Sequence, residues 1–157
     1  MKGNAAKPAL RNIAENRQAR FLYEIEDSLE AGIELLGSEV KSLREGKVSL
    51  AEGYAAPKGS EFFLYKVHIP PYKAAGLFGH EPLRPRRLLL HRREAQKWLS
   101  KVRERGLTLV PLSLYFKKGW AKVQLGLCVG KKQSDKRQDI KERQVRREVA
   151  VAFRRRR

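Results

Sequence analysis

The chain has 157 residues, of which 35 are Lys or Arg and 17 are Asp or Glu, so its formal net charge is +18. An apolar fraction of 41% excludes wholesale disorder. No apolar run approaches the roughly 20 residues that cross a bilayer, so we expect no membrane partner. The length of 157 residues predicts one globular domain.

The N-terminal sequence and the cysteine content predict a cytoplasmic protein. Residues 1–15 are polar and unpatterned and lack the apolar segment of a secretory signal. We interpret them as a flexible arm. The single Cys128 cannot form an internal disulfide, which fits a reducing compartment.

The excess of positive charge predicts a polyanionic partner, because unneutralised charge repels itself in a compact chain. Nucleic acid is the leading candidate. An anionic membrane surface would need basic residues opposite a broad apolar helix face, which the best predicted helix lacks. A merely soluble basic protein is the remaining alternative.

Apolar patterns in the first half predict strands and one short helix. Alternation over 21–35 changes phase at 27–28, which indicates a long strand bent at that point. A short helix is predicted over 39–45. Strands over 48–56 and 61–68 are predicted to form a hairpin.

A long proline-rich loop over 69–87 separates this half from the next, and its Pro-rich segment is not interpreted as a ligand motif. Apolar residues at helical spacing then predict a helix over 92–105, closed by Gly106. Strands over 107–116 and 120–129 predict a second hairpin with a three-residue turn.

Pro111 lies within the first strand of that hairpin, so it must occupy an edge position or a bulge. About six antiparallel strands with peripheral short helices predict a mainly β fold. The preferred architecture is a small closed β-barrel of oligonucleotide-binding type over 16–130. An open α+β sheet is the alternative.

Residues 131–157 form a basic tail with 12 Lys or Arg and 4 Asp or Glu, a net charge of +8. The tail contains no Gly or Pro that would break a helix. Its apolar stripe is thin and irregular, however. We expect a tail that is disordered when free and helical once RNA neutralises it.

Catalytic and metal motifs are not found, so no enzyme, metal site or cofactor is predicted. The run 126–132 has three residues between its glycines and Lys where a phosphate loop needs Ser or Thr. His68, His80 and His91 lack ligand partners at zinc spacing.

Two features are candidates for recognition instead. In an extended segment, Leu89 faces opposite Leu88 and Leu90, so one face of this run is exposed unless both sides are buried. Glu30 faces opposite its apolar neighbours. A carboxylate there could accept hydrogen bonds from base or ribose donors, although most such glutamates are only solvated surface.

Several segments together closely resemble one known family, in the same order and spacing from about residue 16 to 153. The family is that of the SsrA-binding protein, also called small protein B. The segments that carry the resemblance are Asn16-Arg17-Gln18-Ala19-Arg20, Glu30-Ala31-Gly32-Ile33, Gly37-Ser38-Glu39-Val40-Lys41-Ser42-Leu43-Arg44, Arg87-Leu88-Leu89-Leu90-His91-Arg92-Arg93-Glu94, Gly106-Leu107-Thr108-Leu109-Val110-Pro111-Leu112, Gly130-Lys131-Lys132-Gln133-Ser134-Asp135-Lys136-Arg137 and Ile140-Lys141-Glu142-Arg143.

The resemblance implies an RNA-binding protein of trans-translation. Members bind the tRNA-like part of transfer-messenger RNA and, with elongation factor Tu and GTP, deliver it to stalled ribosomes. The tail folds as a helix in the vacant mRNA channel, and the protein itself catalyses nothing. A monomer is expected.

The resemblance also implies the site residues. The RNA-contacting positions of the barrel fall on Asn16, Glu30, Leu89 and His91. The tail positions that would meet ribosomal RNA are Lys131, Lys132, Asp135, Lys136, Arg137, Ile140, Lys141 and Arg143.

Two tail positions depart from the family pattern, since Ser134 stands where relatives often carry an aromatic side chain or His, and Val145 stands where some carry Trp. Stacking on rRNA bases is not expected there. The runner-up is a basic ribosomal or ribosome-assembly protein. An RNA-modifying enzyme is a third alternative, but no cofactor pocket is indicated.

Overall fold

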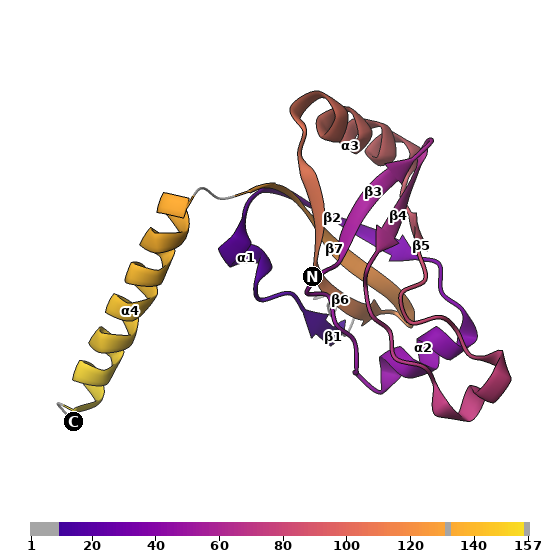
Figure 1. The fold of residues 1–157 in the computed structure, drawn as a ribbon, viewed down its shortest axis with the longest axis horizontal. Coiled ribbons are helices and arrows are strands. Elements are labelled where there is room, and N and C mark those ends of the chain that lie inside the picture. Colours follow the sequence, from indigo (N-terminus) through magenta and orange to yellow (C-terminus); the bar gives the residue numbers. More distant parts are fainter. Residues whose placement is uncertain (1–9, 131–132, 156–157) are drawn as a thin grey trace, which may run out of the picture.

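The structure, a computed structural model, describes residues 10–130 and 133–155. Figure 1 shows a β-rich body with one long helix standing away from it. In chain order the elements are β1 (Leu10–Glu15), α1 (Ala19–Leu22), β2 (Tyr23–Ile33), α2 (Gly37–Arg44), β3 (Tyr54–Lys58), β4 (Glu61–Tyr65), the 3-10 helix η1 (Lys73–Phe78), β5 (Arg86–Leu89), α3 (Arg92–Arg105), β6 (Thr108–Lys117), β7 (Trp120–Gly130) and α4 (Gln133–Arg155).

The antiparallel strands close into a ring. The sheet order is β1-β6-β3-β4-β5-β2-β7, and β6 also pairs with β7. The long pairings are β2 with β7 and β6 with β7, whereas β3 meets β6 only at Ala55 and Leu109. This closure confirms the mainly β, barrel-like fold and overturns the open-sheet alternative.

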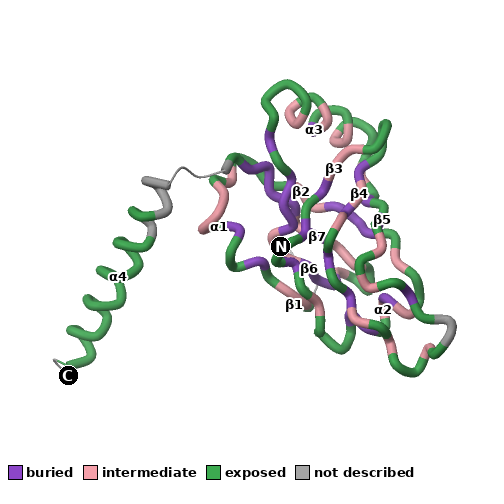
Figure 2. Tube along the Cα trace, viewed as in Figure 1, coloured by how far each residue is buried: buried purple, intermediate pink, exposed green. Residues whose placement is uncertain are grey.

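The inward faces of the strands build the core. Val123, Leu125 and Leu127 of β7 alternate inward and are at most 1% exposed. Trp98 is the buried anchor of α3 and packs into the same cluster. Figure 2 shows these buried segments along the strands, while the described residues of α4 stay exposed.

Residues 10–15 are not part of a flexible arm, so that prediction is wrong for them. They form β1, which pairs with β6 from Leu10 opposite Lys117 to Glu15 opposite Ser113. The sequence of β1 lacks clean alternation, and the unpaired edge of β6 supplies the hydrogen bonds that order it. Residues 1–9 lie outside the described part of the chain.

The predicted strand over 21–35 begins later than expected. Ala19–Leu22 forms the one-turn helix α1, so Phe21 is helical and β2 starts at Tyr23. The register of β2 against β7 shifts between Ile25 and Asp27, which confirms the predicted bend. β2 ends at Ile33.

Both predicted hairpins form, with differences in length and turn. β3 and β4 are shorter than predicted because beyond them the chain pairs only through an isolated bridge, Ser49 with His68. The β6–β7 turn has two residues, not three, since Lys118 and Gly119 both adopt positive φ, at 52° and 80°. Pro111 lies at a register shift, which confirms the predicted bulge.

The two predicted barrel helices are confirmed. α3 runs over Arg92–Arg105 and ends at Gly106, whose φ is 61°. α2 runs over Gly37–Arg44, slightly longer than predicted. The loop over 69–87 is more ordered than expected, because it contains η1 and the first residues of β5.

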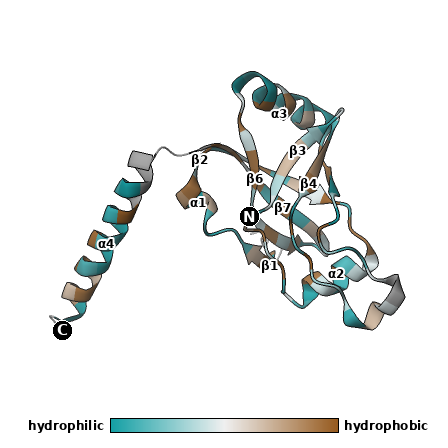
Figure 3. Ribbon diagram, viewed as in Figure 1, coloured by the Kyte–Doolittle hydropathy of each residue, from teal (hydrophilic) through white to brown (hydrophobic). Residues whose placement is uncertain are grey.

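The tail is helical in the structure from Gln133 to Arg155. α4 continues from the end of β7 and leads away from the barrel (Figure 1). Hydrophilic and hydrophobic residues are mixed along its described length (Figure 3). Helix formation agrees with the sequence, and disorder of the free tail stays a prediction.

Candidate nucleic-acid interface

A groove on the outer surface collects three of the four predicted RNA-contacting residues of the barrel. It lies where β2, β5 and the start of α3 meet and has a volume of about 580 Å³. Glu30, Leu89 and His91 all line it, together with Arg87 and Lys122. Side chains far apart in the sequence therefore converge on one surface.

Leu89 reaches this surface because β5 alternates. Leu88 is 4% exposed and fills the core, whereas Leu89 is 46% exposed. The alternative in which all three leucines are buried is therefore wrong. Gly32 of β2 pairs with Leu89 of β5, and a Cβ added to Gly32 would stand 3.2 Å from the Cβ of Leu89. Glycine at this position permits the close approach of the two strands.

Glu30 points outward from β2 and is held by two side chains of β6. Its carboxylate accepts a hydrogen bond from the hydroxyl of Tyr115, and Lys117 Nζ lies 3.3 Å from the other oxygen. The Tyr115 hydrogen bond is the main cause that lowers the pKa of Glu30, and Lys117 adds to it. Glu30 is thus a half-exposed, ionised acceptor with a fixed orientation.

Tyr115 is the buried member of this pair. Burial, and then the neighbouring carboxylate, raise the pKa of its phenol, so the hydroxyl remains a donor to Glu30. The site therefore offers a negative acceptor beside an apolar leucine, on a chain that is otherwise strongly basic.

His91 is positioned by the start of α3. It is the N-cap residue in extended conformation, and its carbonyl accepts the backbone N–H of Ala95 at 2.9 Å. Its ring is exposed at the rim of the groove, where it can stack or hydrogen-bond.

Asn16 is not brought to the groove. It is 9% exposed, and its side-chain amide donates to the carbonyls of Leu50 at 3.3 Å and Pro111 at 3.1 Å. These bonds fix the connection from β1 to α1 against β6. The structure gives Asn16 a structural role, and its RNA contact stays a prediction.

The predicted tail residues fall on α4 or just before it. Lys131 and Lys132 lie outside the described residues, and so do the side chains of Asp135 and Lys136. The residues of the set that can be placed on the helix surface are all exposed: Arg137, Ile140, Lys141 and Arg143. Their contacts with ribosomal RNA stay predictions.

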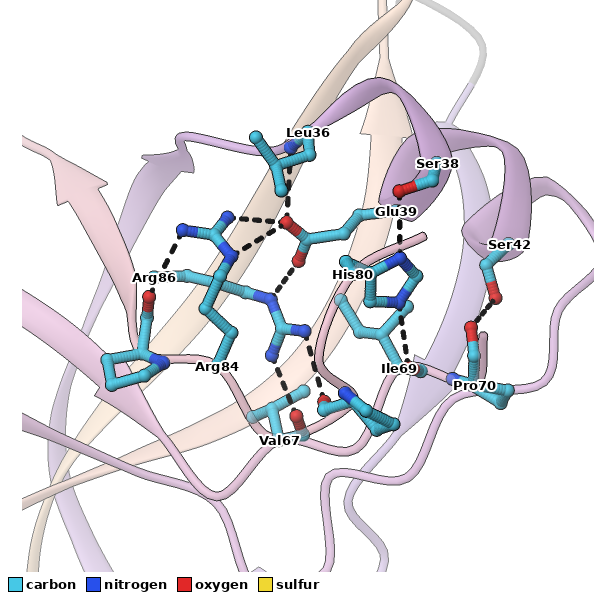
Figure 4. A network of polar contacts seen from close by, with 12 residues as sticks. Leu36, Ser38, Glu39, Ser42, Val67, Ile69, Pro70, His80, Arg84 and Arg86 are labelled. Atoms are coloured by element: carbon cyan, nitrogen blue, oxygen red, sulfur yellow. Dashed lines mark hydrogen bonds and ion pairs between the residues drawn. The ribbon is translucent and has the colours of Figure 1, made fainter. Parts of the chain in front are cut away.

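Sequence reasoning missed a buried ionic network beside the groove (Figure 4). Glu39 of α2 is fully buried and accepts hydrogen bonds from the guanidinium groups of Arg84 and Arg86. Arg86 is also fully buried and donates to the carbonyls of Val67 at 2.8 Å and Pro82 at 3.1 Å.

The network keeps Glu39 ionised. Burial acts to raise the pKa of Glu39, but the hydrogen bonds from Arg86, Arg84 and the backbone N–H of Leu36 outweigh it and lower the pKa. His80 adds a second link, since its ring nitrogens lie 2.9 Å from Ser38 Oγ and 2.9 Å from the Ile69 carbonyl.

This network positions the groove indirectly. Arg86 begins β5, the strand that carries Leu89, and Glu39 ties that strand to α2. The loop before β5 is therefore anchored rather than free. A sequence signal exists only in the Arg84-Pro85-Arg86 spacing, which does not reveal burial.

Among the described residues, no group of three His, Cys, Asp or Glu side chains is placed to hold a metal ion. Within the same part of the chain, no helix is long and apolar enough to span a membrane. The barrel, the groove and the basic helix together define the class of small β-barrel proteins that bind nucleic acid.

Comparison with known proteins narrows this class to one family. The family model described as SmpB protein matches residues 13–155. The SsrA-binding protein of Myxococcus xanthus is 55% identical over 155 residues, which covers 99% of this chain and 96% of the relative. The SsrA-binding protein of Nostoc punctiforme is 55% identical over 142 residues, 90% of this chain and 92% of the relative.

A solved structure is similar as well. A chain of the structure "tmRNA-SmpB: a journey to the center of the bacterial ribosome" matches with a TM-score of 0.64 and 49% identity, over 76% of this chain and 85% of that chain. The chain described here belongs to the SmpB family of SsrA-binding proteins, which confirms the family resemblance in its sequence.

Proposed function

We propose that this protein binds the tRNA-like domain of transfer-messenger RNA and delivers that RNA to stalled ribosomes. The observation that carries the proposal is the convergence of Glu30, Leu89 and His91 on one groove of a barrel that belongs to the SmpB family. The similar solved chain comes from a complex described as tmRNA-SmpB on the bacterial ribosome.

In this proposal the groove recognises the RNA by shape and by a few fixed side chains. Arg87 and Lys122 offer positive charge to phosphates at its edges. Glu30 accepts hydrogen bonds from base or ribose donors, so it contacts parts of the RNA other than the phosphates, which carry no donors. Leu89 gives an apolar contact, and the exposed ring of His91 offers stacking or hydrogen bonding.

The tail serves a second RNA surface in this proposal. The exposed residues Arg137, Lys141 and Arg143 place cationic side chains along α4. The helix then occupies the vacant mRNA channel, where ribosomal RNA neutralises its charge. Residues 131–157 thus form a separate functional unit that follows the barrel, and we expect this unit to be disordered before it binds.

The remaining parts of the proposal concern partners. Elongation factor Tu with GTP joins through the RNA, and the protein acts as a monomer. It performs no covalent chemistry, so the groove is a recognition site only. We expect it to act in the cytoplasm, where the ribosomes are.

Sequencing the RNA that co-purifies with the full-length protein tests the proposal. We expect transfer-messenger RNA to be strongly enriched over bulk tRNA. Enrichment of ribosomal RNA alone, with co-sedimentation on empty subunits that lack transfer-messenger RNA, would instead support a ribosomal or ribosome-assembly protein.

A further inference from the structure

An aromatic row on the outer face of β3 and β4 has no part in the function proposed above. Tyr54 pairs with Tyr65 across the hairpin, and their rings stack with centroids 5.4 Å apart and planes 26° apart. The ring of Phe63 continues the row at 6.4 Å from that of Tyr65. We call Tyr54, Phe63 and Tyr65 the aromatic row.

The fold does not need these rings in its core. The alternate residues Ala55, Phe62 and Leu64 point inward and are at most 5% exposed. Tyr54 is 37% exposed, and the other two rings are half-buried. One face of the hairpin therefore packs against the core, and the other face carries the stacked rings.

Cationic side chains flank the aromatic row on the same face. The ammonium of Lys58 lies 5.8 Å from the centroid of the Phe63 ring. Arg87 of β5 pairs directly across from Phe63. Its side chain is 46% exposed, and its Nε lies 3.8 Å from Glu34 and 3.7 Å from Glu61, separations that leave the guanidinium accessible to a stronger anionic partner.

The aromatic row is continuous with the groove. Arg87 and Glu61 line the groove. Phe63 of β4 pairs with Arg87 of β5, so its ring lies next to the edge of the groove. Figure 1 shows β3, β4 and β5 side by side in the barrel wall. A chain of nucleotides that leaves the groove past Arg87 therefore reaches the rings without crossing another element.

We propose that the aromatic row stacks unpaired bases of an RNA, with Lys58 and Arg87 on its phosphates. This rests on the proposed function, because it needs RNA in the adjoining groove. Exposed aromatic rings beside cations suit single strands, since every base has a face that can stack. An apolar peptide would instead desolvate Lys58 and Arg87 without pairing them.

The test uses the full-length protein and two probes. One probe is a transcript of the tRNA-like part of transfer-messenger RNA, and the other is a fluorescein-labelled oligouridine. We expect Tyr65→Leu to weaken oligouridine binding about tenfold, a loss within the usual value of one stacked base. Tyr65→Phe keeps the ring and is expected to bind as the unchanged protein does.

A matched control comes from Tyr72, whose ring is also partly exposed and has the ammonium of Lys41 at 5.6 Å from its centroid. Tyr72→Leu removes the same kind of ring outside the aromatic row, so oligouridine binding should not change. If Tyr65→Leu lowers the melting temperature, the more exposed Tyr54→Leu replaces it with the same expectation.

A second readout is the NMR signals of the Tyr54 and Tyr65 ring protons, which stacking should shift upfield. The inference is overturned if both leucine variants of the row bind oligouridine as tightly as the unchanged protein, or if Tyr72→Leu loses as much. Failure of the unchanged protein to bind the tRNA-like transcript would instead contradict the proposed function, so the two failures are distinguishable.

Discussion

The guanidinium of Arg143 lies over the ring of Phe21, 5.7 Å from its centroid. This contact joins the middle of α4 to α1. Tyr23, which follows α1, pairs with Gly130 at the end of β7. α1 therefore lies beside the end of β7, after which the tail begins, and it can hold the middle of α4 in place.

Loss of the Phe21 ring should loosen α4 without unfolding the barrel. A cation–π contact at an exposed site contributes about 0.5–1 kcal/mol, so in the RNA-bound protein, where we expect the tail to be helical, Phe21→Leu should raise the hydrogen-exchange rate of α4 amides near Arg143 about two- to fivefold. Phe21→Tyr keeps the ring and serves as the control. Equal exchange in all three proteins would show that the contact does not hold the helix.

The buried Glu39–Arg86 pair should dominate the stability of the loop before β5. Glu39→Gln leaves a fully buried guanidinium without its counter-charge, so the free energy of unfolding should fall by about 3–5 kcal/mol. Denaturant unfolding measures this loss.

A double-mutant cycle separates the pair from its surroundings. Because Arg86→Met removes the charge that Glu39→Gln leaves unpaired, the double variant should lose less than the sum of the two single losses. Strict additivity would mean that the two side chains do not stabilise each other.

The free energy of unfolding should also fall in acid, because Glu39 must be ionised to stabilise the fold. The folded-state pKa of Glu39 lies below its ordinary value of 4.5, so its contribution is complete above that value and is lost as the pH falls through the folded pKa. Asp27 and Glu30 act in the same direction because their pKa values are also lowered. Thermal melting of the unchanged protein should therefore show a steeper acid decline than that of Glu39→Gln.

The carboxylate of Glu30 should matter for RNA and little for the fold. Glu30→Gln keeps an acceptor for the Tyr115 hydroxyl and loses only a half-exposed ion pair with Lys117, so the melting temperature should fall only slightly. Affinity for the tRNA-like RNA should fall about tenfold, within the usual value of one base-edge contact.

Glu24→Gln on the same strand is the matched control for charge. Glu24 is exposed and does not line the groove, so its variant should bind slightly more tightly or equally. If Glu30→Gln binds as well as Glu24→Gln does, then Glu30 is only solvated surface.

Phosphate contacts should appear in the salt dependence of binding. Lys122 lines the groove, and Lys122→Gln should reduce the slope of log K against log salt by about 0.7–0.9 if it contacts one phosphate. The same slope in both proteins would place Lys122 outside the RNA footprint.

Local periodicity explains which parts of the fold were predictable. The strict alternation of Val123, Leu125 and Leu127 predicts β7, and the period-two exposure of Leu89 follows from the same rule. Long-range pairing explains the errors. β1 has no clean pattern and exists because β6 offers it an edge, and α1 is too short to leave a helical period.

The site was predictable only in part for a related reason. Family resemblance indicated Glu30, Leu89 and His91, and the barrel brings them together. The burial of Glu39 and Arg86 depends on a partner 47 residues away, so no local pattern reveals it. Asn16 shows the converse case, because a polar residue that the family resemblance assigns to RNA binding also has a structural role, which is to donate to the backbone of β6.

In the proposed function, the barrel and the tail engage two different RNA surfaces. Truncation after Gly130 tests it most directly, by measuring affinity for the tRNA-like RNA and delivery of transfer-messenger RNA to stalled ribosomes in the same preparation. We expect the truncated protein to bind this RNA with unchanged affinity and no longer to deliver transfer-messenger RNA to stalled ribosomes. Loss of RNA affinity in a truncated barrel that melts as the full chain does would contradict it.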